Sequence, residues 1–215
     1  MNLTVVTLTN PLFNRDLTRC IQSVKNALPE KAKHEIIECN SYSLWVKTRY
    51  DMMKLDDIVV IVDDDDYISK DSLYYVIEAL NETDAGFAYT REVMIQDSMK
   101  PKVNKPTTEY SRLQQGPQTV HHMMAYNTKY VTQRSWNLIQ KVQLGVEWIM
   151  RVDAACNGGA IHIPVDGYFW VQHSGQICNM PAIRTGFEQK IPAIVNELSS
   201  WNTRTGTIPT WELPK

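Results

Sequence analysis

The sequence predicts a single-domain α/β protein in which helices flank a mostly parallel central sheet. Short apolar runs that suit buried strands alternate with segments whose apolar residues recur at helical spacing. One of these runs, at 58–62, is rich in β-branched residues and leads into four consecutive aspartates. The chain has 215 residues, of which 43% are hydrophobic and 21% charged, so it can bury one large core without a second domain.

The first part of the chain is expected to contain four strands with a helix between each pair. The expected strands lie at 3–8, 35–39, 58–62 and 85–90. The expected helices carry Leu17, Cys20, Ile21, Val24 and Leu28, then residues 45–55, then Leu73, Val76, Ile77 and Leu80. A run that alternates strand and helix in this way is typical of a parallel sheet, because parallel neighbours need a crossover connection.

The second part is less regular. Residues 97–118 are polar, contain three prolines and have weak periodicity, so we expect a flexible loop or a lid there. Regular structure is expected to resume afterwards, with strands at 119–126, 160–164 and 167–172 and helices at 131–142, 146–156 and 187–198.

Composition narrows the classes of function. The formal net charge of -2 argues against indiscriminate binding to nucleic acid or acidic membranes, although a local basic groove remains compatible with it. The four cysteines form no CxxC pair, so neither a zinc knuckle nor a disulfide framework is expected. The N-terminus has no signal-like pattern, and no window approaches the roughly 20 apolar residues of a membrane span. We therefore expect a cytoplasmic protein without a transmembrane segment.

The four aspartates at 63–66 are the most informative feature. Adjacent carboxylates repel one another and disfavour strands, so their position at the end of a buried strand predicts a neutralising cation. Mg²⁺ or Mn²⁺ carrying a phosphorylated ligand suits that position, because ligands of open α/β sheets bind at the carboxyl ends of strands. Asp63 and Asp65 point the same way in an extended segment and form the natural pair. The alternative is a solvated acidic turn before the helix near Ser72.

Several short motifs, taken in order, resemble a known family. They are Thr7-Leu8-Thr9-Asn10, Val62-Asp63-Asp64-Asp65-Asp66, Gly145-Val146-Glu147-Trp148, the stretch from Gly158 to Pro164, and Gln172-His173-Ser174-Gly175. Over roughly residues 3–175 the chain is similar to GT-A glycosyltransferases, above all the inverting family 2 enzymes. The resemblance implies one GT-A (Rossmann-like) domain. Its expected parts are a nucleotide-sugar-binding half at 1–96, the loop or lid at 97–118, an acceptor and catalytic half at 119–175, and a C-terminal tail with one helix at 176–215.

The resemblance also implies a nucleotide-sugar donor, a UDP-sugar in the first place, and Mn²⁺ or Mg²⁺ as cofactor. Asp65 is the main expected metal ligand, Asp63 is expected at the metal or the ribose, and His173 is expected as a further ligand. A cation there would stabilise the charge that the leaving nucleoside diphosphate gains. The residues expected to bind the nucleotide sugar are Thr7, Thr9, Asn10, Glu38, Asn40, Arg49, Asp63 and Asp64.

Inverting transfer requires a base for the acceptor hydroxyl, and we expect Glu147 to be that base. The family often has an acidic pair at this point, whereas here Trp148 fills one position, so Asp153 further along the same helix is the second choice. The structural alternative for Glu147 is an acid in the first turn of a helix, which the helix dipole favours.

The acceptor is expected to contact His121, His122, Trp148 and Arg184. Two acceptor classes stay open: a surface glycan, and a hydroxymethylated base in DNA, as for a phage-encoded enzyme in its host's cytoplasm. For DNA, Arg184, Lys190 and Arg204 would contact phosphates. Two other functions are weaker: a sugar nucleotidyltransferase, whose glycine-rich phosphate loop is missing near the first strand, and a non-catalytic module that binds nucleotide sugars.

Overall fold

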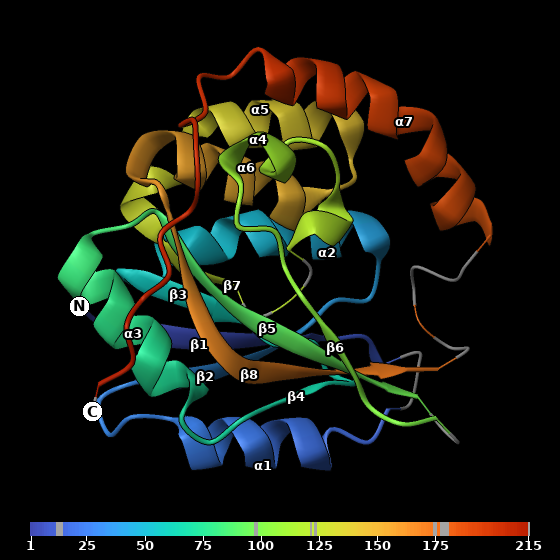
Figure 1. Cartoon of the computed structure of the whole chain (residues 1–215). Coiled ribbons are helices and arrows are strands. Elements are labelled where there is room, and N and C mark those ends of the chain that lie inside the picture. Colours follow the sequence, from blue (N-terminus) through green and yellow to red (C-terminus); the bar gives the residue numbers. More distant parts are fainter. Residues whose placement is uncertain are drawn as a thin grey trace.

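The computed structural model describes residues 1–11, 15–96, 99–120, 122, 124–173, 176 and 181–214, without the side chains of 181–184. It confirms an α/β architecture in which one curled sheet lies between two layers of helices (Figure 1). The sheet has the strand order β2-β1-β3-β7-β5-β8-β4, and β6 pairs with β5 at the side. The strands are β1 (Leu3–Thr9), β2 (Lys33–Glu38), β3 (Ile58–Ile61), β4 (Tyr67–Ile68), β5 (Phe87–Gln96), β6 (Lys102–Asn104), β7 (Met124–Asn127) and β8 (Ala160–Gln172).

The sheet is mixed, although most of its central strands share one direction. β1 pairs in parallel with β2 and β3, and β5 pairs in parallel with β8. β7 lies between β3 and β5 and is antiparallel to both, so β3 and β5 point the same way. The carboxyl ends of β1 and β3 therefore meet at one edge of the sheet, where a ligand site is expected.

The helices form a hydrophobic core on each face of the sheet. They are α1 (Thr18–Ala27), α2 (Tyr42–Asp51), α3 (Ser72–Thr83), α4 (Tyr110–Leu113), α5 (Gln133–Val142), α6 (Val146–Gly158) and α7 (Pro181–Ser199). In β3, Val60 packs with the residues of α1 and α3, whereas Val59 packs with those of α2, α5 and α6. Because both faces of β3 are buried, its sequence is continuously apolar rather than alternating.

Two of the expected strands differ in the structure. Thr119, the first residue of the strand expected at 119–126, belongs to a 3-10 turn at Pro117–Thr119, and the described strand β7 covers Met124–Asn127. The two strands expected at 160–164 and 167–172 are one strand, β8. The register of β8 against β5 shifts between His162 and Asp166, so Pro164 lies in an irregularity where its missing N–H leaves no ladder bond broken.

The segment expected to be a loop or lid at 97–118 contains regular structure. β5 continues to Gln96, β6 pairs with it as a hairpin, and α4 follows. Tyr110 and Leu113 of α4 are buried in the core. The segment therefore packs against the rest of the domain, which its polar composition did not indicate. The short strand β4, which pairs with β8, was also missed. None of the described helices is long and apolar enough to cross a bilayer.

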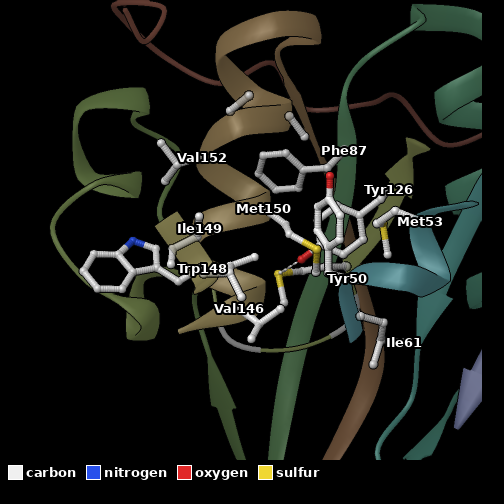
Figure 2. Close-up of a cluster of buried hydrophobic side chains, with 14 of the residues drawn as sticks. Tyr50, Met53, Ile61, Phe87, Tyr126, Val146, Trp148, Ile149, Met150 and Val152 are labelled. Atoms are coloured by element: carbon white, nitrogen blue, oxygen red, sulfur yellow. Dashed lines mark hydrogen bonds between the residues drawn. The ribbon is translucent and has the colours of Figure 1, made fainter. Parts of the chain in front are cut away.

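Helix α6 lies at the centre of one core, where Figure 2 shows its apolar side chains packed among those of α2, β5 and β7. Trp148 is 1% exposed and donates its indole N–H to the carbonyl of Leu113, 2.8 Å away. Because Val146 and Trp148 on either side are buried, the position of Glu147 at the open end of this helix is fixed by packing.

Candidate functional site

A cleft of about 610 Å³ opens at the carboxyl ends of β1 and β3. It contains several of the predicted residues together with aromatic and apolar side chains from α2, β8 and α7. Its lining includes Thr9, Asn10, Arg15, Trp45, Arg49, Asp63, Asp64, Asp65, His122, Glu147, Trp170, Gln172, Phe187, Glu188 and Ile191. The sheet edge and the N-terminus of α6 thus face each other across one cavity large enough for a small-molecule ligand.

Arg49 joins the two sides of the cleft. It is 2% exposed, and its guanidinium forms ion pairs with both Asp63 and Glu147. The same guanidinium lies over the ring of Trp45, 3.9 Å from the ring centroid. Burial raises the pKa of Asp63, but Arg49 and His122 together outweigh burial and hold that pKa below its usual range. Asp63 is therefore ionised and held in a fixed orientation.

Asp64 and Asp65 share a second arginine. Arg15 forms ion pairs with both carboxylates, at 3.0 Å from its Nη1 to Asp65. Burial raises the pKa of Asp64 despite this guanidinium. The Nε2 atom of His173 lies 2.8 Å from Oδ2 of Asp65, the same oxygen that Arg15 contacts. The structure thus brings together the expected ligands Asp65 and His173, which are far apart in the sequence.

Asp66 is not among the described residues that line the cleft; its carboxylate contacts β8 instead. It is 1% exposed and accepts hydrogen bonds from the Tyr168 hydroxyl and the backbone N–H of Val171, both at 2.8 Å. Tyr168 in turn accepts from the backbone N–H of Asp63, at 3.1 Å. Burial raises the pKa of Asp66 to about 8.

His122 lies between two carboxylates. Its Nδ1 contacts Glu92, its Nε2 is 3.6 Å from Asp63, and its ring stacks on Tyr168 at a centroid distance of 4.7 Å. Burial lowers the pKa of His122, but the nearby carboxylates of Asp63, Glu92 and Asp66 together outweigh burial and raise the pKa to about 10. The ring is therefore a cation in this arrangement.

Two groups of side chains have the donors that Mn²⁺ or Mg²⁺ accepts. Asp65 and His173 offer a carboxylate oxygen and an imidazole nitrogen in direct contact. Asp63, Asp66 and His122 each offer one ligand atom, and these atoms all lie within 4.8 Å of one another. Carboxylate oxygens suit both ions and imidazole suits Mn²⁺ better, so the residues present fit a divalent cation. Asp65 lines the cleft, and the His173 side chain that contacts it is 35% exposed.

Some expected donor contacts lie elsewhere. Thr9 and Asn10 line the cleft, but Thr7 is fully buried inside β1, with its hydroxyl 3.0 Å from Nε2 of His34. Thr7 is two residues short of the strand end, so helix α1 covers it. Glu38, the last residue of the edge strand β2, and Asn40, which follows that strand, are exposed and are not among the described residues of the lining.

Asp153 is a structural residue and not a second choice for the base. It is fully buried, and it accepts hydrogen bonds from the backbone and side chain of Thr132, from Ser135 and from Arg134. These bonds tie the start of α5 to α6. At about 3.6 residues per turn, the six residues from Glu147 do not complete whole turns, so Asp153 faces away from the cleft.

The expected acceptor residues are only partly assembled. His121 lies outside the described residues, as does the side chain of Arg184, and Trp148 lines the cleft but is a core residue that is 1% exposed. Lys190 donates to the carbonyl of Val142, 2.7 Å away. Arg204 packs beside Gly159, at the other end of β8 from the cleft.

Several residues of the site escaped the sequence-based prediction, among them Arg15, Trp45, Glu92 and Tyr168. A charged residue within an apolar run was the available signal for Glu92, which is 3% exposed in β5. Nothing in the local pattern marks Tyr168. Its role depends on β8 lying beside the aspartates.

No protein-family model matches the chain, and no curated protein matches it either. Solved structures do match. The fold superposes on Staphylococcus aureus TarS 1-349 with a TM-score of 0.57, at 14% identity over 93% of this chain and 71% of that one. The chain has the GT-A fold. TarS 1-349 in complex with UDP gives a TM-score of 0.61 at 13% identity, over 92% of this chain and 65% of that one. Another TarS structure gives 0.62 at 13% identity, over 95% of this chain but 41% of that one.

Proposed function

We propose that the protein is a metal-dependent glycosyltransferase that transfers a sugar from a UDP-sugar to an acceptor hydroxyl with inversion. The observation that carries the proposal is the meeting of the aspartate cluster and Glu147 across one cleft at the sheet edge. The choice of donor is supported by TarS 1-349, which has been solved with UDP-GlcNAc and with UDP and shares the fold. A non-catalytic module would not require a carboxylate opposite the aspartates.

Asp65 and His173 would hold Mn²⁺ or Mg²⁺, and Asp63 would contact the ion or the donor ribose. The cation would supply positive charge to the diphosphate as it leaves. Thr9 and Asn10, at the end of β1, would hydrogen-bond the nucleoside. Asp64, which pairs with Arg15, would keep that guanidinium near the diphosphate oxygens.

Glu147 would accept the proton of the acceptor hydroxyl as its oxygen attacks the anomeric carbon. The bond between that carbon and the diphosphate oxygen breaks, and its electron pair leaves with the nucleoside diphosphate. Attack from the face opposite the leaving group inverts the anomeric configuration. Glu147 suits this role because it lies in the first turn of α6, where packing fixes it, and because Arg49 holds its carboxylate facing the cleft.

A carbohydrate acceptor fits the charges of the cleft better than DNA. Among the described residues that line it, the charged side chains are five carboxylates, three guanidinium groups and His122. Arg15 and Arg49 already pair with aspartates, and Arg151 donates to the carbonyls of residues 116, 117 and 120. A polyanion would meet this acidic lining unfavourably, whereas the half-buried Phe187 and Ile191 offer an apolar surface to a sugar ring.

Ligand-induced thermal stabilisation tests the donor assignment. UDP and UDP-GlcNAc should raise the Tm of the protein in Mn²⁺ and much less in EDTA, because a ligand that binds only the folded state stabilises it by mass action. GDP and ADP serve as matched nucleotides. Release of free UDP from the sugar nucleotide in the presence of a glycan mixture then separates a transferase from a binding module. An equal shift with all nucleotides and no turnover would contradict the proposal.

DNA binding should be weak and should not depend on the basic residues of the tail. A DNA-modifying enzyme would lose affinity steeply as salt rises and would weaken by a similar step for each phosphate contact removed. We expect duplex binding by wild type to be undetectable at physiological salt, and Arg184→Ala and Lys190→Ala to change nothing at low salt. Salt-dependent binding that Arg184→Ala reduces would instead favour the hydroxymethylated DNA base as acceptor.

A further inference from the structure

A chain of buried polar contacts runs from the β5–β6 hairpin to the aspartate cluster. Asn104 of β6 donates to Oε1 of Glu92, 2.7 Å away, and the other oxygen of Glu92 contacts Nδ1 of His122. The Nε2 atom of His122 then faces Oδ2 of Asp63 at 3.6 Å. The histidine side chain is 11% exposed and that of Glu92 is 4% exposed, so this chain is largely shielded from water.

The His122 ring is also fixed in its plane. It stacks on Tyr168 with an angle of 4° between the rings and lies 5.7 Å from the ring of Trp170. Tyr168 bonds the backbone N–H of Asp63 and the carboxylate of Asp66. Tyr168 of β8 therefore fixes both the ring of His122 and the backbone of Asp63, the residue that His122 faces.

We propose that His122 is a positioning residue that, backed by Glu92, orients the Asp63 carboxylate for the nucleotide donor. The sequence had suggested an acceptor contact for this histidine. The geometry directs both ring nitrogens at carboxylates, one of them at the end of β3. The inference rests on the proposed function, because it takes a uridine nucleotide as the ligand that Asp63 meets. It differs from a metal-ligand role for His122, which the spacing to Asp63 and Asp66 would also allow.

The test is isothermal titration calorimetry of UDP in saturating MnCl₂, and of MnCl₂ alone. His122→Gln and Glu92→Gln should each weaken UDP binding by roughly 10- to 100-fold, the usual effect of removing a residue that orients a ligand-binding group. The double variant should bind UDP no more weakly than His122→Gln, because both changes break the same series of contacts. Mn²⁺ alone should bind as in wild type, since Asp65 and His173 are untouched.

His162 provides a matched control. It is a histidine of β8 that is 9% exposed and lies 5.2 Å from the Tyr89 ring, and no hydrogen-bond partner of its ring nitrogens is found among the described residues. His162→Gln should leave UDP affinity unchanged even where it lowers Tm. If His122→Gln does not fold, Glu92→Gln and Asn104→Ala test the same series of contacts. Asn104→Ala should lose less UDP affinity than Glu92→Gln.

The outcomes separate the two proposals. Wild type that binds no UDP would overturn the donor assignment and this inference with it. Wild type that binds UDP, with variants that bind it equally well or lose no more than His162→Gln, would overturn the positioning role alone. Loss of Mn²⁺ binding in His122→Gln without UDP would also overturn it, because the histidine would then be a ligand.

Discussion

Asp65→Ala should abolish sugar transfer while the protein stays folded. Asp65 reaches the open side of the aspartate cluster and contacts His173 and Arg15, so its removal takes away the main proposed metal ligand without opening a cavity in the core. Loss of one carboxylate also relieves repulsion within the cluster. Activity measured as UDP release, with Tm measured in parallel, checks both parts of the expectation, and EDTA on the wild type should reproduce the loss.

Asp166→Ala is the control for this variant. Asp166 pairs with Arg91 at the surface, with a side chain that is 41% exposed, and such a pair contributes little to stability. Its loss should leave transfer intact. Near wild-type transfer by Asp65→Ala in added Mn²⁺ would remove Asp65 from the metal site and point to Asp63, Asp66 and His122 as the ligands.

Glu147→Gln should keep donor binding and lose turnover by roughly two to four orders of magnitude, the usual contribution of a positioned general base. Glutamine preserves the size of the side chain and cannot accept the proton. The affinity for UDP should change little, because Arg49 still pairs with Asp63 in the variant. Turnover numbers at saturating donor and acceptor, together with the UDP dissociation constant, measure the two effects separately.

A second carboxylate in the cleft can be tested as the base. Glu188 of α7 also lines the cleft and is exposed. If Glu188→Gln rather than Glu147→Gln stops turnover, the base assignment is wrong. NMR of the product should show an anomer inverted relative to the donor. Retention of configuration would require a different role for Glu147.

The elements that carry the site could be predicted because their signals are local. The run at 58–62 is apolar throughout since β3 is buried on both faces, and an acidic cluster directly after such a strand indicates a ligand site at the sheet edge. The helix that begins near Glu147 has apolar residues at helical spacing, and α6 begins at Val146 as expected. Hydrophobic pattern also gave the α/β class.

Local patterns failed where a residue's role depends on what lies beside it. Asp153 and Glu147 share one helix and one chemistry, but Asp153 faces the buried start of α5. The polar stretch at 97–118 contains a hairpin strand and a helix that are held by long-range pairing rather than by their own propensity. Pro164 suggested a strand break that a register shift absorbs.

The sequence by itself determined the α/β class, the position of most of the strands and helices, and that four carboxylates stand at the end of a buried strand. Only the tertiary structure decided which side chains contact those carboxylates: Arg49 and His122 at Asp63, Arg15 at Asp64, His173 at Asp65 and Tyr168 at Asp66. The physical reason is that periodicity records only which face of an element is buried. The partner of a buried charge comes from another part of the chain, and that partner is set by how the strands are ordered in the sheet.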